Sequence, residues 1–234
     1  MSEFDDPTAQ GIISQSRGPV RARVVGNTSI SIRALGPNHR TRLLKHLLSL
    51  EAEDRFLRFG YVANDGQIRS YVERLDFVND AVFGVFNHRL HIVAMAHLAI
   101  YKAPGGAPVG EFGVSVAPSL RGQGIGGRLY ERAALHARNE GVEVLQIQAL
   151  AGNAPMLAIA RKRGATVHRH GAESEAYLKL PRPDLESRLQ EIIETYWADL
   201  HYSLAAQSRI WLGLLQGFQV VRSRAIKAGK ICSP

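Results

Sequence analysis

The alternation of apolar and polar positions changes period along the chain, and each change marks an element. Apolar residues at 112, 114 and 116 follow the two-residue period of a strand, and Pro118 ends that run because proline cannot donate to a sheet ladder. The next apolar residues recur every four positions, as on one buried stripe of a helix: Ile125, Leu129, Ala133 and Ala137. Gly141 is suited to end that helix. The stretch 111–141 therefore predicts strand, turn, glycine-rich loop and helix.

The same patterns predict the other elements around this unit. Strands are expected at residues 29–33, 81–87, 90–101, 142–150, 166–170 and 175–179. Helices are expected from Pro37 to Leu50, over 70–76 and over 153–164. A loop rich in glycine and proline, 102–108, separates the second hairpin strand from Glu111, which is expected to open the next strand. Strands and helices mixed in this order indicate an α/β domain.

The two ends of the chain differ from the middle. Residues 1–28 are polar, show no sustained period and predict a flexible tail. The expected domain covers residues 29–181. Pro181 and Pro183 separate it from a helical extension, residues 182–234. Large apolar residues recur at helical spacing in this extension: Leu185, Leu189, Ile192, Ile193, Tyr196, Trp197, Leu200, Ile210, Trp211, Leu214, Leu215 and Phe218. So apolar a segment is expected to pack on the domain or on a second copy in a homodimer, the alternative being a membrane-surface helix.

Composition narrows the possible functions. The single cysteine, Cys232, excludes a disulfide framework and a cysteine-built zinc site, and the nine histidines show no metal spacing. No signal peptide or apolar run of membrane-spanning length is visible, so we expect a cytoplasmic protein. The net charge of +8 leaves nucleic-acid binding as an alternative, but the charges are scattered and we expect no nucleic-acid partner.

The glycine-rich loop carries the chemistry. Glycines at a helix start let free backbone N–H groups approach an anion at the positive end of the helix dipole, and a pyrophosphate fits there. Arg121 and Arg128 would flank it. A plain tight turn is one alternative. A dinucleotide site is another, since 122–127 match G-x-G-x-x-G, but the loop starts too far after its strand and no acidic residue ends the next strand.

The complete motif is R-x-x-G-x-G, from Arg121 to Gly126, and it follows a strand that ends in V-x-V-x-P. This motif resembles the acyl-CoA loop of the GCN5-related N-acetyltransferases, the GNAT superfamily. The resemblance covers about residues 29–180. It implies a mixed, largely antiparallel central sheet with flanking helices. It also implies direct transfer of an acetyl group from acetyl-CoA, the co-substrate, to an amine, and no metal. The acceptor would be a protein lysine or a small amine.

A second stretch, 48–59, resembles a segment of bacterial GNAT proteins that include protein-lysine acetyltransferases, through E-D-R-x-x-R-F from Glu53 to Phe59. In this fold the first helices border the acceptor groove. The alternative is a helix junction with local ion pairing of Asp54 to Arg55 or Arg58.

The resemblance also assigns roles to residues. Glu111 would be the general base that takes the proton of the amine. Strand residues and loop residues would bind the cofactor: Val114, Ser115, Val116, Arg121, Gly122, Gln123, Gly124, Ile125, Gly126 and Gly127. A backbone N–H near Val114 or Val116 would face the thioester oxygen. Asn153 would cap the following helix and lie near the cofactor.

One departure from the family pattern concerns the general acid. Many members place a tyrosine seven residues after the asparagine, where this chain has Ala160. His170 and Tyr177 are substitutes by sequence only. Because the tyrosine is missing, a different class of function stays open: a non-catalytic acyl-CoA-binding regulatory module. The presence of Glu111 argues against this alternative.

Overall fold

The computed structural model describes residues 30–171, 173–204 and 207. The expected tail 1–28 and the part of the C-terminal extension that holds residues 210–218 lie outside the described residues, so the three-part division of the chain stays a prediction. Within these described residues, seven strands form one sheet in the order β1-β2-β3-β4-β5-β7-β6. They are β1 (Ile32–Ala34), β2 (Ala81–Phe86), β3 (Ile92–Lys102), β4 (Pro108–Val116), β5 (Val144–Leu150), β6 (Thr166–His170) and β7 (Glu173–Lys179).

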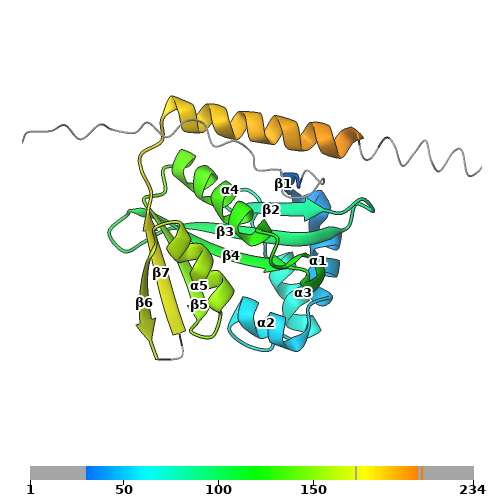
Figure 1. Cartoon of the computed structure of the whole chain (residues 1–234), viewed down its shortest axis with the longest axis horizontal. Coiled ribbons are helices and arrows are strands. Elements are labelled where there is room, and N and C mark those ends of the chain that lie inside the picture. Colours follow the sequence, from blue (N-terminus) through cyan, green and yellow to red (C-terminus); the bar gives the residue numbers. More distant parts are fainter. Residues whose placement is uncertain (1–29, 172, 205–206, 208–234) are drawn as a thin grey trace, which may run out of the picture.

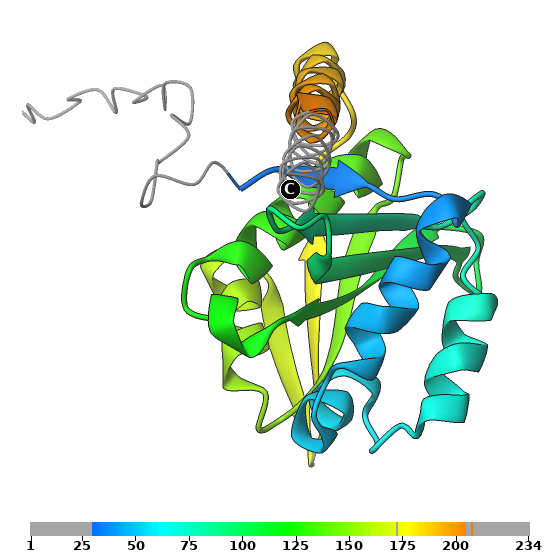
Figure 2. The same cartoon turned by 90° about the vertical axis from the view of Figure 1, so that its right-hand side faces the viewer.

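All neighbouring strands run antiparallel except β4 and β5, which are parallel. Helices α4 (Ile125–Asn139) and α5 (Ala154–Lys162) cover one face of the sheet. Helices α1 (Arg40–Leu48), α2 (Ala52–Phe59) and α3 (Asp65–Glu73) lie on the other, as Figures 1 and 2 show. Short 3-10 turns, Pro37–His39 and Pro118–Leu120, precede α1 and the glycine loop. The expected mixed, largely antiparallel sheet with flanking helices is confirmed.

Two hydrophobic clusters hold these layers together. Under α4 and α5, the apolar stripe of the central helix is buried as the four-residue spacing predicts, with Leu129, Ala133 and Ala137 at 0% exposure. The second cluster joins α1 and α3 to the sheet through Leu43, Leu47, Ile68 and Met95. Gly141, at φ +78°, ends α4 in the left-handed conformation that a glycine adopts without strain.

Two predicted boundaries were wrong. Helix α3 begins at Asp65 rather than near residue 70, because Asn64 forms a capping box in which its side chain accepts a bond from the N–H of Gln67 at 2.9 Å. Strand β4 begins at Pro108 rather than at Glu111, since a proline is tolerated as the first residue of a strand. Glu111 is therefore the fourth residue of its strand.

The C-terminal helix, residues 185–204, lies across the outer side of α4 and is drawn in yellow and orange in Figure 1. Its contacts with the domain are mainly polar. Arg132 and His136 of α4 donate to Glu191 at 2.9 and 2.7 Å, and Asn139 donates to the same carboxylate at 2.6 Å. None of the described helices is long and apolar enough to cross a membrane.

Of the two arrangements expected for this segment, packing of its large apolar residues on the domain was wrong for the described part, and packing on a second copy stays a prediction. The large apolar side chains from Leu185 to Leu204 are between 37% and 80% exposed. The helix instead turns its polar side towards α4, because the buried Arg132, 6% exposed, needs a carboxylate partner.

Candidate functional site

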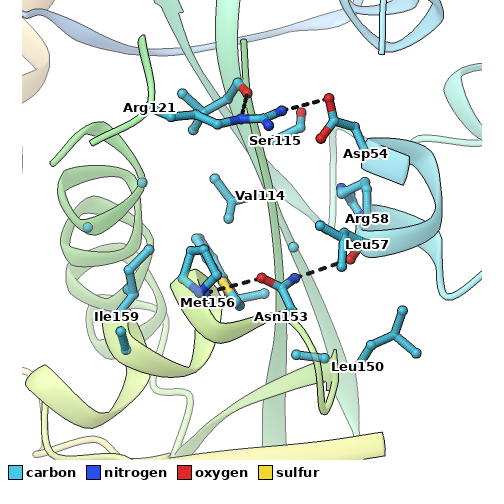
Figure 3. Close-up of a pocket in the computed structure, with 18 of the residues that line it drawn as sticks. Asp54, Leu57, Arg58, Val114, Ser115, Arg121, Leu150, Asn153, Met156 and Ile159 are labelled. Carbon is cyan, nitrogen blue, oxygen red and sulfur yellow. Dashed lines mark hydrogen bonds and ion pairs between the residues drawn. The ribbon is translucent and has the colours of Figure 1, made fainter. Parts of the chain in front are cut away.

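Strands β4 and β5 separate halfway along their length. They pair only from Val109–Glu111 to Val144–Gln146, although β4 continues to Val116 and β5 to Leu150. The edge of β4 that faces β5 after Glu111 therefore has no strand partner. A cavity of about 750 Å³ opens at this split and reaches from the glycine loop to Glu111 and Glu175. Figure 3 shows it, with β4 on one wall and α5 and α2 on others.

The glycine loop forms one end of the cavity. Gly122 and Gly124 both have φ +75°, which side chains adopt only with strain, and Gly124 is the N-cap of α4. The N–H groups of the first helical turn, 125–127, have no partner within the helix. A Cβ on Gly126 would lie 3.0 Å from Cδ1 of Ile159, so this glycine also lets α4 and α5 approach closely.

Of the ten cofactor-binding residues predicted on the strand and loop, all but Gln123 line this cavity. Gln123 instead donates its amide to the carbonyl of Ser119 at 3.3 Å. Arg128, expected to flank an anion, is not among the lining residues and donates to the carbonyl of Ile30 at 2.7 Å. Two other cations, Lys162 and Arg163 at the end of α5, do line the cavity.

Arg121 and Asp54 join the loop to α2. Their side chains form an ion pair of 2.6 Å, and Nε of Arg121 donates to the carbonyl of Val116 at 3.2 Å (Figure 3). The predicted local pairing of Asp54 with Arg55 or Arg58 was wrong. Arg55 pairs with Asp65 instead, because its guanidinium caps the carbonyls of residues 48, 50 and 63 around the helix junction.

Asn153 joins two walls of the cavity. Its side-chain oxygen accepts from the N–H of Met156 at 3.2 Å, which confirms the predicted N-cap. Its amide nitrogen donates to the carbonyl of Leu57 in α2 at 3.4 Å (Figure 3). The arrangement links the α5 terminus to the helix that borders the other side of the cavity.

Glu111 lies beside the split, exposed, on the same side of the sheet as Gly113. That side is polar on the neighbouring strands. Its members, which we call the polar strip, are Tyr101, Glu111, Gln146, Gln148, Glu175 and Tyr177. Tyr101 donates to Gln146 at 3.2 Å, and Tyr177 donates to Glu175, whose carboxylate raises the pKa of that phenol. Two carboxylates therefore face solvent in a strip that begins at the cavity.

Arg58 reaches into the cavity from α2. A Cβ on Gly113 would lie 2.7 Å from its Nη1, so the guanidinium packs directly on the backbone of β4. Its Nη2 donates to the hydroxyl of Tyr71 at 2.7 Å, and that hydroxyl is 2.9 Å from Nδ1 of His97. His97 in turn lies 3.0 Å from Asp80. Burial lowers the pKa of His97, so its ring is neutral and fits a chain in which each group donates to the next.

A second buried histidine supports the cavity wall. His46 of α1, 4% exposed, lies with Nε2 2.9 Å from Oγ of Ser115. Burial lowers the pKa of His46 to about 4, and the nearby charge of Arg58 acts in the same direction. The ring is therefore neutral near pH 7, and it holds the hydroxyl of a residue that lines the cavity.

The substitute general acids do not gather at the cavity. Ala160 is 0% exposed in the core and has no titratable group. Tyr177 lies on the polar strip but is not among the cavity-lining residues, and the side chain of His170 lies outside the described residues. Among the described residues no cluster of histidine, cysteine, aspartate or glutamate could hold a metal ion.

Several groups at the site could not be assigned from sequence. Asp54, Arg58 and His46 come from helices that precede the loop by more than sixty residues, and their contacts depend on tertiary packing. The dense charges from Glu53 to Phe59 were the one available sign, since a helix end does not require them.

Comparisons with known proteins agree with this geometry. The model of the acetyltransferase (GNAT) family matches residues 45–165. No curated protein matches the sequence. The GNAT domain of a PAT protein from S. lividans superposes with a TM-score of 0.56 at 18% identity, covering 65% of this chain and 92% of that chain.

Two further structures show the same fold. An acetyltransferase of the GNAT family from Streptococcus pneumoniae has a TM-score of 0.53 at 15% identity, over 65% of this chain and 100% of that one. The protein yncA from Salmonella typhimurium, solved with its cofactor acetyl-CoA, has a TM-score of 0.51 at 17% identity, over 68% of this chain and 99% of that one.

Proposed function

The chain belongs to the acetyltransferase (GNAT) family, and from that premise we propose that it acetylates a primary amine from acetyl-CoA, with Glu111 as the general base. Acetyl-CoA-dependent acetyltransfer is the family's reaction. The residue roles and the acceptor are the proposal. The observation that carries it is the end of the β4–β5 pairing at Glu111, which puts a carboxylate beside the split that a linear cofactor can enter.

The chain's residues fit acetyl-CoA. The positive-φ glycines and the free N–H groups of the first turn of α4 suit its diphosphate. Lys162 adds positive charge to the same cavity, which Arg121 and Arg163 also line while they pair with Asp54 and Glu131. The unpaired edge of β4 at 114–116 can bond the amides of the pantetheine arm. Bound acetyl-CoA supplies an acetyl thioester.

Glu111 performs the proton transfer in this proposal. An alkyl ammonium has a pKa near 10.4 and is unreactive until it loses a proton, which a carboxylate oxygen of Glu111 accepts directly or through one water. The second carboxylate of the polar strip, Glu175, makes this surface attractive to a cation before deprotonation. Arg58 supplies a permanent positive charge on the cavity wall, and it offsets negative charge that develops there when the amine attacks.

The acceptor we favour is a lysine side chain on a protein or peptide rather than a small amine. The main contacts of helices α1–α3 with the central strands of the sheet are with β3, β4 and β5, and none of these helices makes a main contact with β7, which carries Glu175 and Tyr177 of the polar strip. An open strip of this kind fits an extended substrate, whereas small-molecule sites are concave and bury most of their ligand. The cytoplasm, where acetyl-CoA and protein lysines meet, is the compartment we propose.

The decisive experiment compares Glu111→Gln with the wild type in two assays. Turnover of acetyl-CoA with lysine peptides and small amines should fall by about 100-fold or more, in line with the loss of a general base. Calorimetric affinity for CoA should stay within about threefold, because the glycine loop is untouched. Glu143→Gln, an exposed glutamate outside the cavity, is the matched control and should retain turnover.

The alternative of a non-catalytic acyl-CoA-binding module predicts another result. The wild type would then bind CoA but turn over none of the acceptors, and Glu111→Gln would change neither property. Unchanged turnover in an active Glu111→Gln variant would remove Glu111 from the mechanism while leaving the family assignment intact.

A further inference from the structure

The described part of the C-terminal helix carries a continuous apolar stripe that no described residue of the domain covers. Its members, which we call the outer stripe, are Leu185, Leu189, Ile192, Ile193, Tyr196, Trp197, Leu200 and Leu204, at 37–80% exposure. Tyr196 and Trp197 are 66% and 54% exposed. Aromatic side chains contribute about 150–250 Å² each, so the stripe exceeds the few hundred Å² of apolar patch that a monomer usually exposes.

The helix cannot simply roll over to bury this stripe. Its opposite side is fixed to the domain by Glu191 against Arg132, His136 and Asn139. Ser187 donates to Asn139 at 2.6 Å, and Asp199 pairs with Arg33 at 2.7 Å near the other end of the helix. Rotation would strip a buried arginine of its carboxylate, so the outer stripe stays outward.

The spacing of the stripe indicates which partner covers it. The intervals between successive members are four, three, one, three, one, three and four residues, the same in both directions. The midpoint falls between Glu194 and Thr195. A twofold axis through that point, perpendicular to the helix, brings every apolar position opposite another apolar position on an antiparallel copy. Ile193 would face Tyr196 of the second copy, and Leu189 would face Leu200.

We infer that the outer stripe is the interface of an antiparallel homodimer, formed with the same helix of a second copy of this chain. Among residues 185–204 there is one arginine, Arg188, and no lysine, and the carboxylates of Glu191, Glu194 and Asp199 pair with arginines of the domain. A helix that lies on a membrane surface is rich in lysine and arginine on its polar face, so this composition argues against a membrane as the partner. A helix of this length spans about 30 Å, enough for several turns of side-chain packing at 8–10 Å between axes.

This interface leaves the candidate site open. The C-terminal helix and α2, which borders the cavity, lie at opposite ends of the molecule in both Figure 1 and Figure 2. Loss of the dimer should therefore leave CoA affinity unchanged, and the inference stands or falls independently of the proposed function.

The first test measures mass. Analytical ultracentrifugation of the wild-type full chain at about 20–100 µM should show twice the chain mass of 25.7 kDa. Ile193→Glu places a charge near the axis and should raise the dimer dissociation constant by about 100-fold or more. Val78→Glu introduces the same charge at a residue that is 91% exposed elsewhere and should remain dimeric. Circular dichroism melts of both variants confirm folding.

The second test reads the direction of the helices. In a Cys232→Ser background, Leu189→Cys and Leu200→Cys are prepared as separate proteins. Each position lies about 8 Å from the axis, so identical sites on two copies are about 16 Å apart, too far for a disulfide. Oxidation of either protein alone should give no cross-link, while the mixture should give a cross-linked dimer.

Three results would overturn the inference. A monomeric wild type, a dimer that survives Ile193→Glu, or self-cross-linking of Leu189→Cys each contradicts an antiparallel interface on the outer stripe. Flotation of a monomeric wild type with vesicles of phosphatidylcholine and phosphatidylglycerol would assign the stripe to a membrane surface instead.

Discussion

Acidification should weaken the fold measurably through His46, which is buried under the cavity wall. Burial lowers its pKa from 6.5 in a model peptide to about 4. Between these values the unfolded chain binds a proton that the folded protein does not, so the free energy of unfolding falls as the pH falls. The stabilisation is complete above pH 6.5 and is lost progressively towards pH 4. For these two pKa values the loss from pH 7.5 to pH 5 is about 2 kcal/mol.

Other groups contribute to the same transition, so the experiment is a comparison. Burial also lowers the pKa values of His39 and His97. His46→Gln keeps an amide donor for Ser115 but cannot titrate. Urea unfolding followed by circular dichroism at pH 7.5 and pH 5 should therefore show a decrease about 2 kcal/mol smaller in the variant than in the wild type. His88→Gln, at an exposed turn, is the control and should match the wild type.

The same variant separates stability from the site. Ser115 lines the cavity, but a pKa of about 4 leaves the folded protein's His46 mostly neutral at pH 5, so the affinity of the wild type for CoA should change between pH 7.5 and pH 5 no more than that of His46→Gln. Equal decreases in unfolding free energy for the two proteins would refute the reasoning, because they would show that the buried imidazole titrates as it does in the unfolded chain.

Three further predictions concern other contacts. Gly113→Ala places a Cβ 2.7 Å from the guanidinium of Arg58 and should displace it from the strand. Turnover should then fall at least about tenfold, while the CoA affinity measured by calorimetry is retained. Unchanged turnover would show that Arg58 is not needed beside Gly113. Lys162→Glu should raise the Kd for CoA about tenfold, less at high salt, and a salt-independent effect would argue against direct charge attraction. Burial raises the pKa of Glu191, but hydrogen bonds from His136 and Arg132 outweigh burial and lower this pKa to about 2. Glu191→Gln should lower the free energy of unfolding in urea by about 1–2 kcal/mol at neutral pH, after allowance for solvent screening. The decrease should be smaller at pH 3, because the stabilisation by the carboxylate is present above pH 4.5 and is lost towards pH 2. An equal decrease at both pH values would contradict the carboxylate's role.

The local features of this protein could be predicted from its sequence. The strand, glycine loop and helix from Glu111 to Gly141 depend on periodicity, on proline and on backbone freedom, which are properties of neighbouring residues. The N-cap at Asn153 is local in the same sense, and the structure confirms it. The boundaries at Asp65 and Pro108 were missed because a capping box and a proline at a strand start are weak local signals.

The tertiary structure decided which distant groups meet. Asp54 has arginines one and four positions away, yet its partner is Arg121, because the approach of α2 to the loop competes with local pairing. The chain of Arg58, Tyr71, His97 and Asp80 has no trace in the sequence, since its members come from separate elements.

The C-terminal helix shows the same limit most clearly. Its sequence determined that one side is apolar, because that depends only on the 3.6-residue period. Which side faces the domain was decided by tertiary contacts: Glu191 pairs with the buried Arg132 and accepts hydrogen bonds from His136 and Asn139, partners that the sequence of the helix alone does not reveal.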